Sequence, residues 1–212
     1  MKNNIIKSLL CLVVLIFSSC DTESTDNVSD TTDYAVLEII GDTELIIPQG
    51  DAWVDPGADV TLAGAPYPYT TSLVVDTNVP GVYYITYEAV NDLGFTASAT
   101  RTVVVMSTTP SIYTLAGSWA RSNGSPGTCV QISDREYTYD NAGGVTGANQ
   151  LMITFFNVND DEIYIPFQEN ASASGLSVRS FLPGHIDDND HFRWQLSASG
   201  FYGTFERTFS RQ

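Results

Sequence analysis

The chain has 212 residues, and its 25 Asp and Glu side chains against nine Lys and Arg give a formal charge of −16 at pH 7. A surface this acidic repels phosphate backbones, so the composition argues against nucleic acid as a partner and against direct docking on anionic lipids. Hydrophobic residues make up 43% of the chain, which is enough apolar material for a core in one or two domains.

Residues 1–19 have the three parts of a secretion signal. Lys2 and Lys7 make a basic start, residues 9–17 are all apolar, and two serines lead into Cys20. The apolar run is too short to cross a hydrocarbon layer of ~30 Å as a stable helix, and it is typical of a cleavable signal. Small residues before a cysteine resemble the bacterial lipobox. This resemblance implies a lipoprotein signal peptide and a lipidated Cys20 that binds the membrane, with ordinary secretion or an uncleaved anchor as alternatives.

Removal of this signal would change both the charge and the cysteine count. The only two lysines lie within it, so seven arginines would face 25 acidic residues and the formal charge would be −18. Cys11 would leave with the signal and Cys20 would be acylated, which leaves Cys129 without a partner for an intramolecular disulfide. Strand-forming residues surround Cys129 and no histidine is near it in the sequence, so a buried strand residue is favoured over a nucleophile.

Residues 20–35 are predicted to form an acidic, flexible tether. From Asp21 to Asp33 there is one aliphatic residue, too little apolar surface to offset the entropy of ordering. An acidic stretch after an acylated cysteine also resembles the export tag that sends some Gram-negative lipoproteins to the cell surface. This implies a lipid-anchored outer-membrane protein at the cell surface, with the periplasmic face or retention in the inner membrane as alternatives.

After the tether, the pattern is that of an all-β protein. Short runs of Val, Ile, Thr, Tyr and Phe alternate with Gly, Pro, Asn and Asp, without helical periodicity. The clearest strand covers residues 82–89, and a turn at 91–94 leads to a second strand at 100–105, which predicts a hairpin. Ser, Thr and Pro at 107–111 predict a linker that ends a first domain at 36–106.

A second domain is predicted from residue 112 to residue 212. Turn signals such as Asn123-Gly124 and Pro183-Gly184 separate eight short candidate strands. These strands are expected at 117–122, 129–133, 136–139, 150–158, 162–167, 175–181, 192–196 and 203–209. Eight short antiparallel strands form either a small barrel or a sandwich, and the sequence does not choose between them.

The first domain carries a family resemblance. Four motifs follow one another: Asp55-Pro56-Gly57-Ala58, Pro80-Gly81-Val82-Tyr83, Asp92-Leu93-Gly94 and Arg101-Thr102-Val103-Val104-Val105. Their succession resembles the Ig-like surface domain of unknown function that is repeated in many bacterial surface proteins. The resemblance implies an Ig-like β-sandwich that acts as a spacer or adhesive scaffold. Tyr83 stands where a tyrosine corner is expected, and Ile85 stands where antibody domains place a disulfide cysteine.

The second domain carries a looser resemblance, based on residues 115–119, 137–144 and 202–208. These segments are similar to the C-terminal β domain of two-domain surface lipoproteins from glycan-foraging gut bacteria. Such proteins accompany outer-membrane glycan importers. The resemblance therefore implies a polysaccharide ligand and an outer-membrane uptake complex as partners.

Catalytic or metal chemistry finds little support in the residues. Gly-x-Ser-x-Gly, phosphate-loop and dinucleotide motifs are absent. His185 and His191 flank the acidic stretch Asp187–Asp190, for which a plain turn is favoured and calcium is the alternative because oxygen ligands gather there. A hairpin turn is likewise favoured at 159–162. No cofactor and no metal site is predicted, and the protein is expected not to be an enzyme.

Glycan recognition requires exposed aromatic faces beside hydrogen-bonding groups. Trp194 shares a strand face with two apolar neighbours and is expected in the core, and Trp53 is expected to pack beside a turn. Tyr67 and Tyr69 lie in a Pro-rich loop and are candidate exposed platforms.

Trp119 and Tyr202 are the predicted glycan-binding residues. Trp119 lies at the entrance of the second domain, where core and surface positions are both open. In a strand, the Tyr202 side chain would lie on the opposite face from Phe201 and Phe205. Tyr202 is therefore expected to face outward if the two phenylalanines are buried.

The leading functional hypothesis is a non-catalytic surface lipoprotein that binds glycan as an accessory of an outer-membrane polysaccharide-uptake system. One alternative is an adhesion or assembly component that binds another protein, which a large exposed apolar patch would favour. The second alternative is a glycan hydrolase, which would need two carboxylates converging in a cleft.

Overall fold

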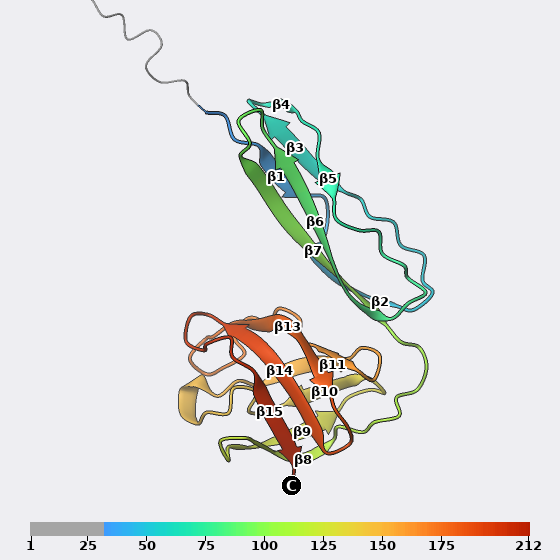
Figure 1. Cartoon of the computed structure of the whole chain (residues 1–212). Coiled ribbons are helices and arrows are strands. Elements are labelled where there is room, and N and C mark those ends of the chain that lie inside the picture. Colours follow the sequence, from blue (N-terminus) through green and yellow to red (C-terminus); the bar gives the residue numbers. More distant parts are fainter. Residues whose placement is uncertain (1–31) are drawn as a thin grey trace, which may run out of the picture. The chain divides into compact units, whose positions relative to one another are not determined.

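A computed structural model describes residues 32–212. The predicted signal peptide at 1–19, the lipidated Cys20 and most of the tether at 20–35 lie outside the described residues. Residues 34–212 form one compact unit of strands with a single short 3₁₀ turn at Gly147–Asn149 (Figure 1). In this described part, no helix has the length and apolar character needed to cross a membrane.

The first half of this unit contains two small β-sheets that enclose an apolar core. One sheet has the strand order β1-β3-β4 and the other β2-β7-β6-β5. The strands are β1 (Val36–Ile39), β2 (Glu44–Pro48), β3 (Ala58–Leu62), β4 (Ala65–Pro66), β5 (Thr70–Thr71), β6 (Gly81–Val90) and β7 (Thr96–Met106). This Ig-like sandwich agrees with the predicted fold class.

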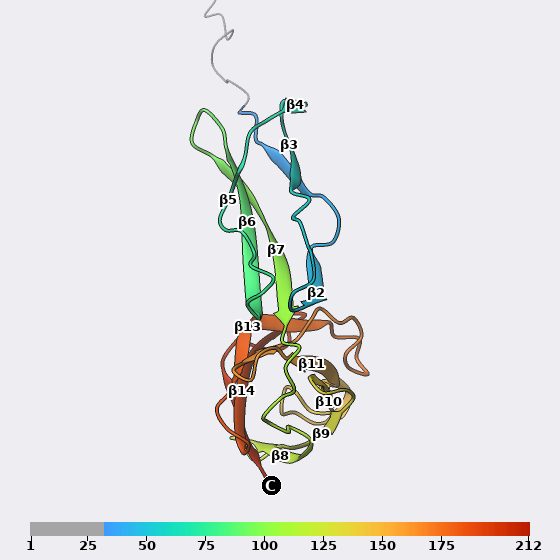
Figure 2. The ribbon, with the colours of Figure 1, turned by 90° about the vertical axis from the view of Figure 1, so that its right-hand side faces the viewer.

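The hairpin of β6 and β7 is the longest element of the sandwich, and the two strands run side by side in both views (Figures 1 and 2). Ile85, Tyr87 and Ala89 alternate along β6 and are buried, whereas their neighbours are more exposed. The period of two is what a half-buried strand requires. The predicted hairpin at this position is confirmed.

The tyrosine-corner prediction is also confirmed. The hydroxyl of Tyr83 donates to the carbonyl of Val79 at 2.8 Å, a few residues upstream. Ile85 is 1% exposed and packs in the core of the sandwich, as expected for an aliphatic residue in place of a disulfide cysteine. Trp53 is half-buried and packs against the same core.

The second half of the unit is a closed eight-stranded barrel with the order β10-β11-β12-β13-β14-β15-β8-β9. Its strands are β8 (Gly117–Arg121), β9 (Pro126–Gln131), β10 (Glu136–Tyr139), β11 (Ile153–Asn157), β12 (Glu162–Tyr164), β13 (Val178–Ile186), β14 (His191–Ala198) and β15 (Arg207–Arg211). The last strand pairs with the first, Phe209 opposite Arg121. Because the strands form a closed ring, the second domain is a barrel and not a sandwich, and the ring leaves no open sheet edge.

Aromatic side chains fill the barrel. Trp194, Phe192 and Leu196 point inward from β14, so the predicted core position of Trp194 is confirmed. The Trp194 ring lies 4.6 Å from the ring of Phe209, measured between centroids. Cys129 is a free thiol, 2% exposed in β9, and burial raises its pKa to about 12, which agrees with a structural role.

Several strand boundaries differ from the predicted ones by a few residues, and two of these differences concern a whole turn or segment. Pro183-Gly184, expected to be a turn, lies inside β13, which continues to Ile186. Register shifts between Ser180 and Leu182 and between Leu182 and His185 accommodate the proline, because a bulge relieves the need for every ladder hydrogen bond. β15 begins at Arg207, since residues 203–206 form no ladder.

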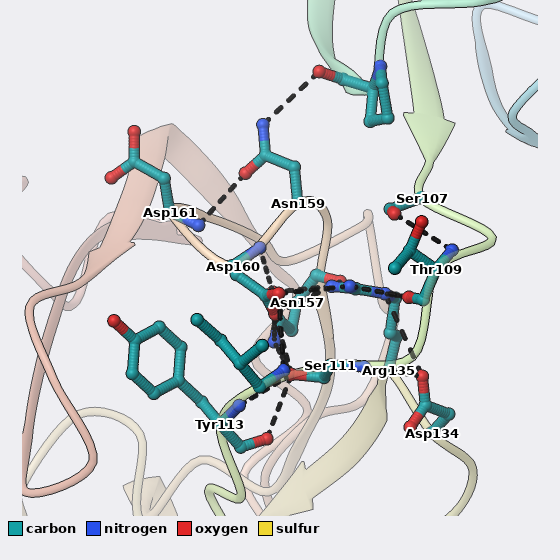
Figure 3. Close-up of polar contacts among 12 residues, drawn as sticks. Ser107, Thr109, Ser111, Tyr113, Asp134, Arg135, Asn157, Asn159, Asp160 and Asp161 are labelled. Carbon is teal, nitrogen blue, oxygen red and sulfur yellow. Dashed lines mark hydrogen bonds and ion pairs between the residues drawn. The ribbon is translucent and has the colours of Figure 1, made fainter.

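The segment between the sandwich and the barrel is held by a polar network around Arg135 (Figure 3). The Arg135 guanidinium donates to the carbonyl of Thr109 at 2.8 Å and to the carboxylate of Asp160 at 3.0 Å. Ser111 donates to the same Asp160 carboxylate at 2.7 Å, and the Asn157 amide donates to it at 3.0 Å. Thr109 and Ser111, which lie in the linker predicted at 107–111, are therefore hydrogen-bonded to Arg135 and Asp160 of the barrel.

A small apolar cluster adds to this junction. Val104 from β7 packs with Val158 and Tyr164 from the barrel, and all three are buried. The Ser107 amide donates to the Val158 carbonyl at 2.9 Å, and the Glu44 carboxylate accepts from the Phe167 amide at 3.0 Å. Apolar packing and hydrogen bonds thus connect the barrel with the sandwich strands within the compact unit.

We expect Tyr139→Phe to leave the protein equally stable or more stable, by up to ~1–3 kcal/mol, because a buried hydroxyl without a partner is removed. The Tyr139 hydroxyl is buried and makes no hydrogen bond in the described part of the chain. The matched control is Tyr87→Phe: Tyr87 is equally buried, but its hydroxyl donates to Asp55 at 2.6 Å and accepts from Arg101 at 2.9 Å. Urea unfolding of both variants is the measurement, and equal destabilisation would contradict this account.

Candidate functional site

Trp119, one of the two predicted glycan-binding residues, lies in the barrel core. Its side chain is 0% exposed, its indole N–H donates to the Leu115 carbonyl at 2.8 Å, and the Arg211 guanidinium covers the ring at 4.5 Å. No face of the indole is open for stacking on a sugar. Trp119 instead packs beneath a surface hollow that it helps to line.

Tyr202 is less exposed than Phe201 and Phe205, which is the opposite of what strand alternation predicts. Phe201 and Phe205 are 53% and 56% exposed, whereas Tyr202 is half-buried and packs against the core. Alternation does not apply here, because residues 203–206 are not in a strand. The Tyr202 hydroxyl donates to the Asn149 carbonyl at 2.7 Å, and a Cβ on Gly143 would lie 2.3 Å from the tyrosine ring. Tyr202 therefore supports loop 140–150.

Two hollows that share Asp140 and Gln150 adjoin this loop, and together we call them the polar groove. The first has a volume of about 420 Å³ and is also lined by Thr128 and Asn141. The second has a volume of about 520 Å³ and is also lined by Asn170. Ligand pockets combine such concave space with a few well-placed polar groups.

Several hydrogen-bonding atoms in the polar groove are available to a ligand. Asp140 uses Oδ1 to accept the Thr128 amide at 2.7 Å, and Gln150 uses its amide N–H to donate to the Asp140 carbonyl at 2.9 Å. Within residues 32–212, Oδ2 of Asp140 and Oε1 of Gln150 make no further hydrogen bond. The groove thus presents fixed acceptors, because each side chain is already held through its other polar atom.

A second feature of the barrel surface is a pair of arginines around an exposed ring. The Arg207 guanidinium lies 4.3 Å from the centre of the Phe205 ring, and the Arg121 guanidinium lies 5.2 Å from the same centre. Arg121 also donates to the Gly143 carbonyl at 3.1 Å. The cluster Arg121–Phe205–Arg207 therefore borders loop 140–150 through Gly143.

The sandwich has an apolar hollow of about 440 Å³ between residues 53–57 and 69–75. Val54 and Val74 are 86% and 91% exposed beside it. Tyr69, a predicted platform, is 37% exposed, while Tyr67 is half-buried and donates its hydroxyl to the Val90 carbonyl. Apolar exposure of this kind is typical of contact with another protein.

The acidic stretch Asp187–Asp190 forms the turn between β13 and β14, as favoured from the sequence. Its carboxylates have separate basic partners in Arg193, His191 and Arg211. Among residues 32–212, no three His, Cys, Asp or Glu side chains come together as metal ligands would. Residues 159–161 likewise form the predicted hairpin turn between β11 and β12.

A hollow of about 260 Å³ on the outside of the barrel contains the two carboxylates that most resemble a catalytic pair, Glu162 and Glu206. Burial raises the pKa of Glu162, although hydrogen bonds from the Asn159 amide and the Val82 backbone oppose the shift. Glu206 forms an ion pair with Arg193 at 3.6 Å. Each carboxylate thus has a structural partner of its own, which does not favour an acid–base pair for glycoside cleavage.

Asp140, Gln150 and Asn170 of the polar groove were not predicted from the sequence. Asp140 and Asn170 lie in polar stretches that are typical of turns, where surface-exposed polar residues are ordinary, and Gln150 is the first residue of the strand predicted at 150–158. No local pattern distinguishes residues that line a groove from residues that only face water. The groove exists only in the folded barrel, where β8, the β9–β10 hairpin and loop 140–150 meet.

One family model matches the sandwich domain. Residues 37–105 match the family described as "Bacterial surface protein, Ig-like domain", which supports the resemblance inferred for the sandwich. A crystal structure of the lipoprotein BT2262 from Bacteroides thetaiotaomicron aligns with 84% of this chain and 100% of that chain, at 21% identity and a TM-score of 0.38. Comparison with curated proteins finds no match.

Proposed function

We propose that the protein is a non-catalytic lipoprotein of the outer-membrane surface that binds glycan in the polar groove of its barrel. The observation that carries the proposal is the pair of adjoining hollows with the fixed acceptors of Asp140 and Gln150. Sugar hydroxyls donate hydrogen bonds to such acceptors. The Ig-like sandwich, matched to a surface-protein family over residues 37–105, supports a location outside the cell.

Trp119 and Tyr202 have supporting roles in this proposal. Trp119 closes the floor of the first hollow, and Tyr202 fixes Asn149 at the end of the 3₁₀ turn beside the second. Both act through the shape of the groove rather than by stacking on sugar. A lipid on Cys20 would keep the groove near the membrane and raise its local concentration for polysaccharide captured by an uptake complex.

Affinity electrophoresis tests glycan binding with the chain lacking residues 1–20, run through gels that contain dextran, xylan, galactan or polygalacturonate. We expect retardation by at least one polysaccharide and a loss of about tenfold in affinity for Gln150→Ala, since one directed hydrogen bond is worth ~1 kcal/mol or more. The control is Gln131→Ala, because Gln131 also donates its amide to a backbone carbonyl, that of Asp134, but lies outside the groove. Absence of retardation in every gel would refute the proposal.

The apolar hollow of the sandwich favours a second candidate function, adhesion to another protein. Val54 and Val74 are 86% and 91% exposed and line this hollow, whose volume of about 440 Å³ is large enough for a side chain of a partner. Binding of a protein that Val74→Asp abolishes, together with no retardation by polysaccharide, would establish this candidate in place of the first.

A further inference from the structure

The barrel contains a buried positive charge without a carboxylate partner. Arg207 is 0% exposed, and its two terminal nitrogens donate to the carbonyls of Phe205 at 3.0 Å and Gly203 at 2.8 Å. Its Nε is buried and has no hydrogen-bond partner. Burying a cation beside neutral groups alone is unfavourable, so this arrangement is unusual in a chain with 25 acidic residues.

Arg121 adds a second charge of the same sign. It is half-buried, donates through Nη1 to the Gly143 carbonyl at 3.1 Å, and has a buried Nε without a partner. Four of the other arginines, in contrast, form ion pairs: Arg101, Arg135, Arg193 and Arg211. Within residues 32–212 neither Arg121 nor Arg207 forms an ion pair, and the remaining arginine, Arg179, is exposed.

The Phe205 ring connects the two charges with the surface. Both guanidinium groups contact this ring, at 4.3 Å and 5.2 Å from its centre, and the ring is 56% exposed. Cation–π contacts hold the arginines in place without neutralising them. An exposed aromatic ring beside an uncompensated guanidinium offers an apolar surface and a charge to the same ligand.

Gly144 leaves room for the Arg121 side chain. A Cβ at this glycine would lie 2.3 Å from Cδ of Arg121, and the glycine has a positive φ of +64°. Only glycine allows both the backbone conformation and the close packing of the arginine chain. Arg121 is thus held against loop 140–150, with its Nη2 free of hydrogen bonds to the described residues.

We propose that Arg121, Phe205 and Arg207 form a subsite for a negatively charged group of a glycan, a uronate carboxylate or a sulfate ester. The anion binds the Arg121 guanidinium, the sugar ring lies on Phe205, and Arg207 stabilises the bound charge from beneath. This inference rests on the proposed glycan function. Burial and the neighbouring Arg121 lower the pKa of Arg207 to about 10, so it remains cationic at pH 7.

The net charge of the protein makes the subsite testable. Without residues 1–20 the chain has a formal charge of −18 and repels polyanions as a whole, so retention by a polyanion must come from a local site. The chain lacking residues 1–20 is run through gels that contain hyaluronan, which carries carboxylates, dextran sulfate, which carries sulfates, or neutral dextran and xylan. The variants are Arg121→Gln and its control Arg179→Gln, which removes the same charge from an arginine that lies 4.9 Å from the exposed ring of Phe167.

We expect hyaluronan or dextran sulfate to retard the protein more than neutral dextran does. Arg121→Gln should weaken that retardation at least about tenfold, because a charge-assisted hydrogen bond is lost, and Arg179→Gln should not. Whichever polyanion binds identifies the group as carboxylate or sulfate. Thermal unfolding of Arg121→Gln shows whether the variant is folded, and Arg121→Lys replaces it if it is not.

Three results would overturn the subsite. Retardation by xylan or dextran alone would remove it and leave the proposed glycan function standing. Equal losses in Arg121→Gln and Arg179→Gln would show that overall charge, not this cluster, binds the polyanion. Retardation by no polysaccharide would remove the subsite together with the proposed function.

Discussion

Arg101→Met should lower the free energy of unfolding by about 3 kcal/mol, because it breaks a buried, hydrogen-bonded ion pair. Arg101 is 1% exposed, and its Nε lies 3.4 Å from the Asp55 carboxylate. It also donates to the Tyr87 hydroxyl at 2.9 Å and to the carbonyls of Ile40, at 2.7 Å, and Asp42. The substitution leaves these acceptors unpaired inside the sandwich. Urea unfolding followed by circular dichroism is the measurement.

The expected loss lies at the low end of the range for buried ion pairs, because Asp55 is 26% exposed and water partly compensates its charge. Arg179→Met is the control: it removes an arginine that forms no ion pair in the described residues, and we expect a change within ~0.5 kcal/mol. A loss of similar size in both variants would show that Arg101 acts only through the net charge. The same would follow if salt abolished the difference.

Arg135→Met should lower the free energy of unfolding by about 2–4 kcal/mol, since it leaves the Asp160 carboxylate without its cation and the Thr109 carbonyl without a donor. Arg135 is 6% exposed, and the Asp160 side chain is 18% exposed. The double variant Arg135→Met with Asp160→Asn should lose less than the sum of the single losses, because the two side chains contact each other directly. Additive losses in this double-mutant cycle would contradict a coupled pair.

The same network predicts a dependence on pH. Burial alone would raise the pKa of Asp160, but hydrogen bonds from Ser111, Arg135 and Asn157 outweigh it and lower the pKa below its ordinary value of 3.8. The ionised carboxylate therefore stabilises the folded state fully above about pH 4, and this contribution is lost as the pH falls through the lowered pKa. We expect Asp160→Asn to reduce the loss of stability between pH 5 and pH 2. An unchanged pH profile would assign the acid sensitivity to other carboxylates.

Much of the architecture could be predicted from local patterns. The alternation of buried and exposed residues in β6, the turn at 91–94 and the inward face of β14 follow from a period of two along the chain. The Ig-like sandwich was recognisable because several short motifs recur in a fixed order over residues 37–105. These features depend on neighbours in the sequence, which the sequence displays directly.

The binding surface could not be predicted in this way. Strand alternation predicts that Tyr202 faces outward if Phe201 and Phe205 are buried, but the chain leaves the ladder after Ala198, and the strand period does not decide the exposure of these residues. Trp119 gives no local sign that Arg211, which pairs with it across the closing strands, will cover its ring. The residue types alone also do not show which arginines form ion pairs, because the carboxylate of an ion pair can lie far from its arginine in the sequence.

The sequence by itself determined that the described chain is all-β, that its first half is an Ig-like sandwich and that Cys129 has no disulfide partner there, because strand periodicity, motif order and cysteine count are local or additive properties. Only the tertiary structure shows that the second domain is a barrel and not a sandwich, and that Arg135 binds the linker through the Thr109 carbonyl. It also shows that Arg121 and Arg207 form no ion pair in the described residues. These outcomes depend on which strands pair at closure and on which side chains then meet. Pairing between distant strands is set by the packing of the whole barrel, which no short stretch of sequence contains.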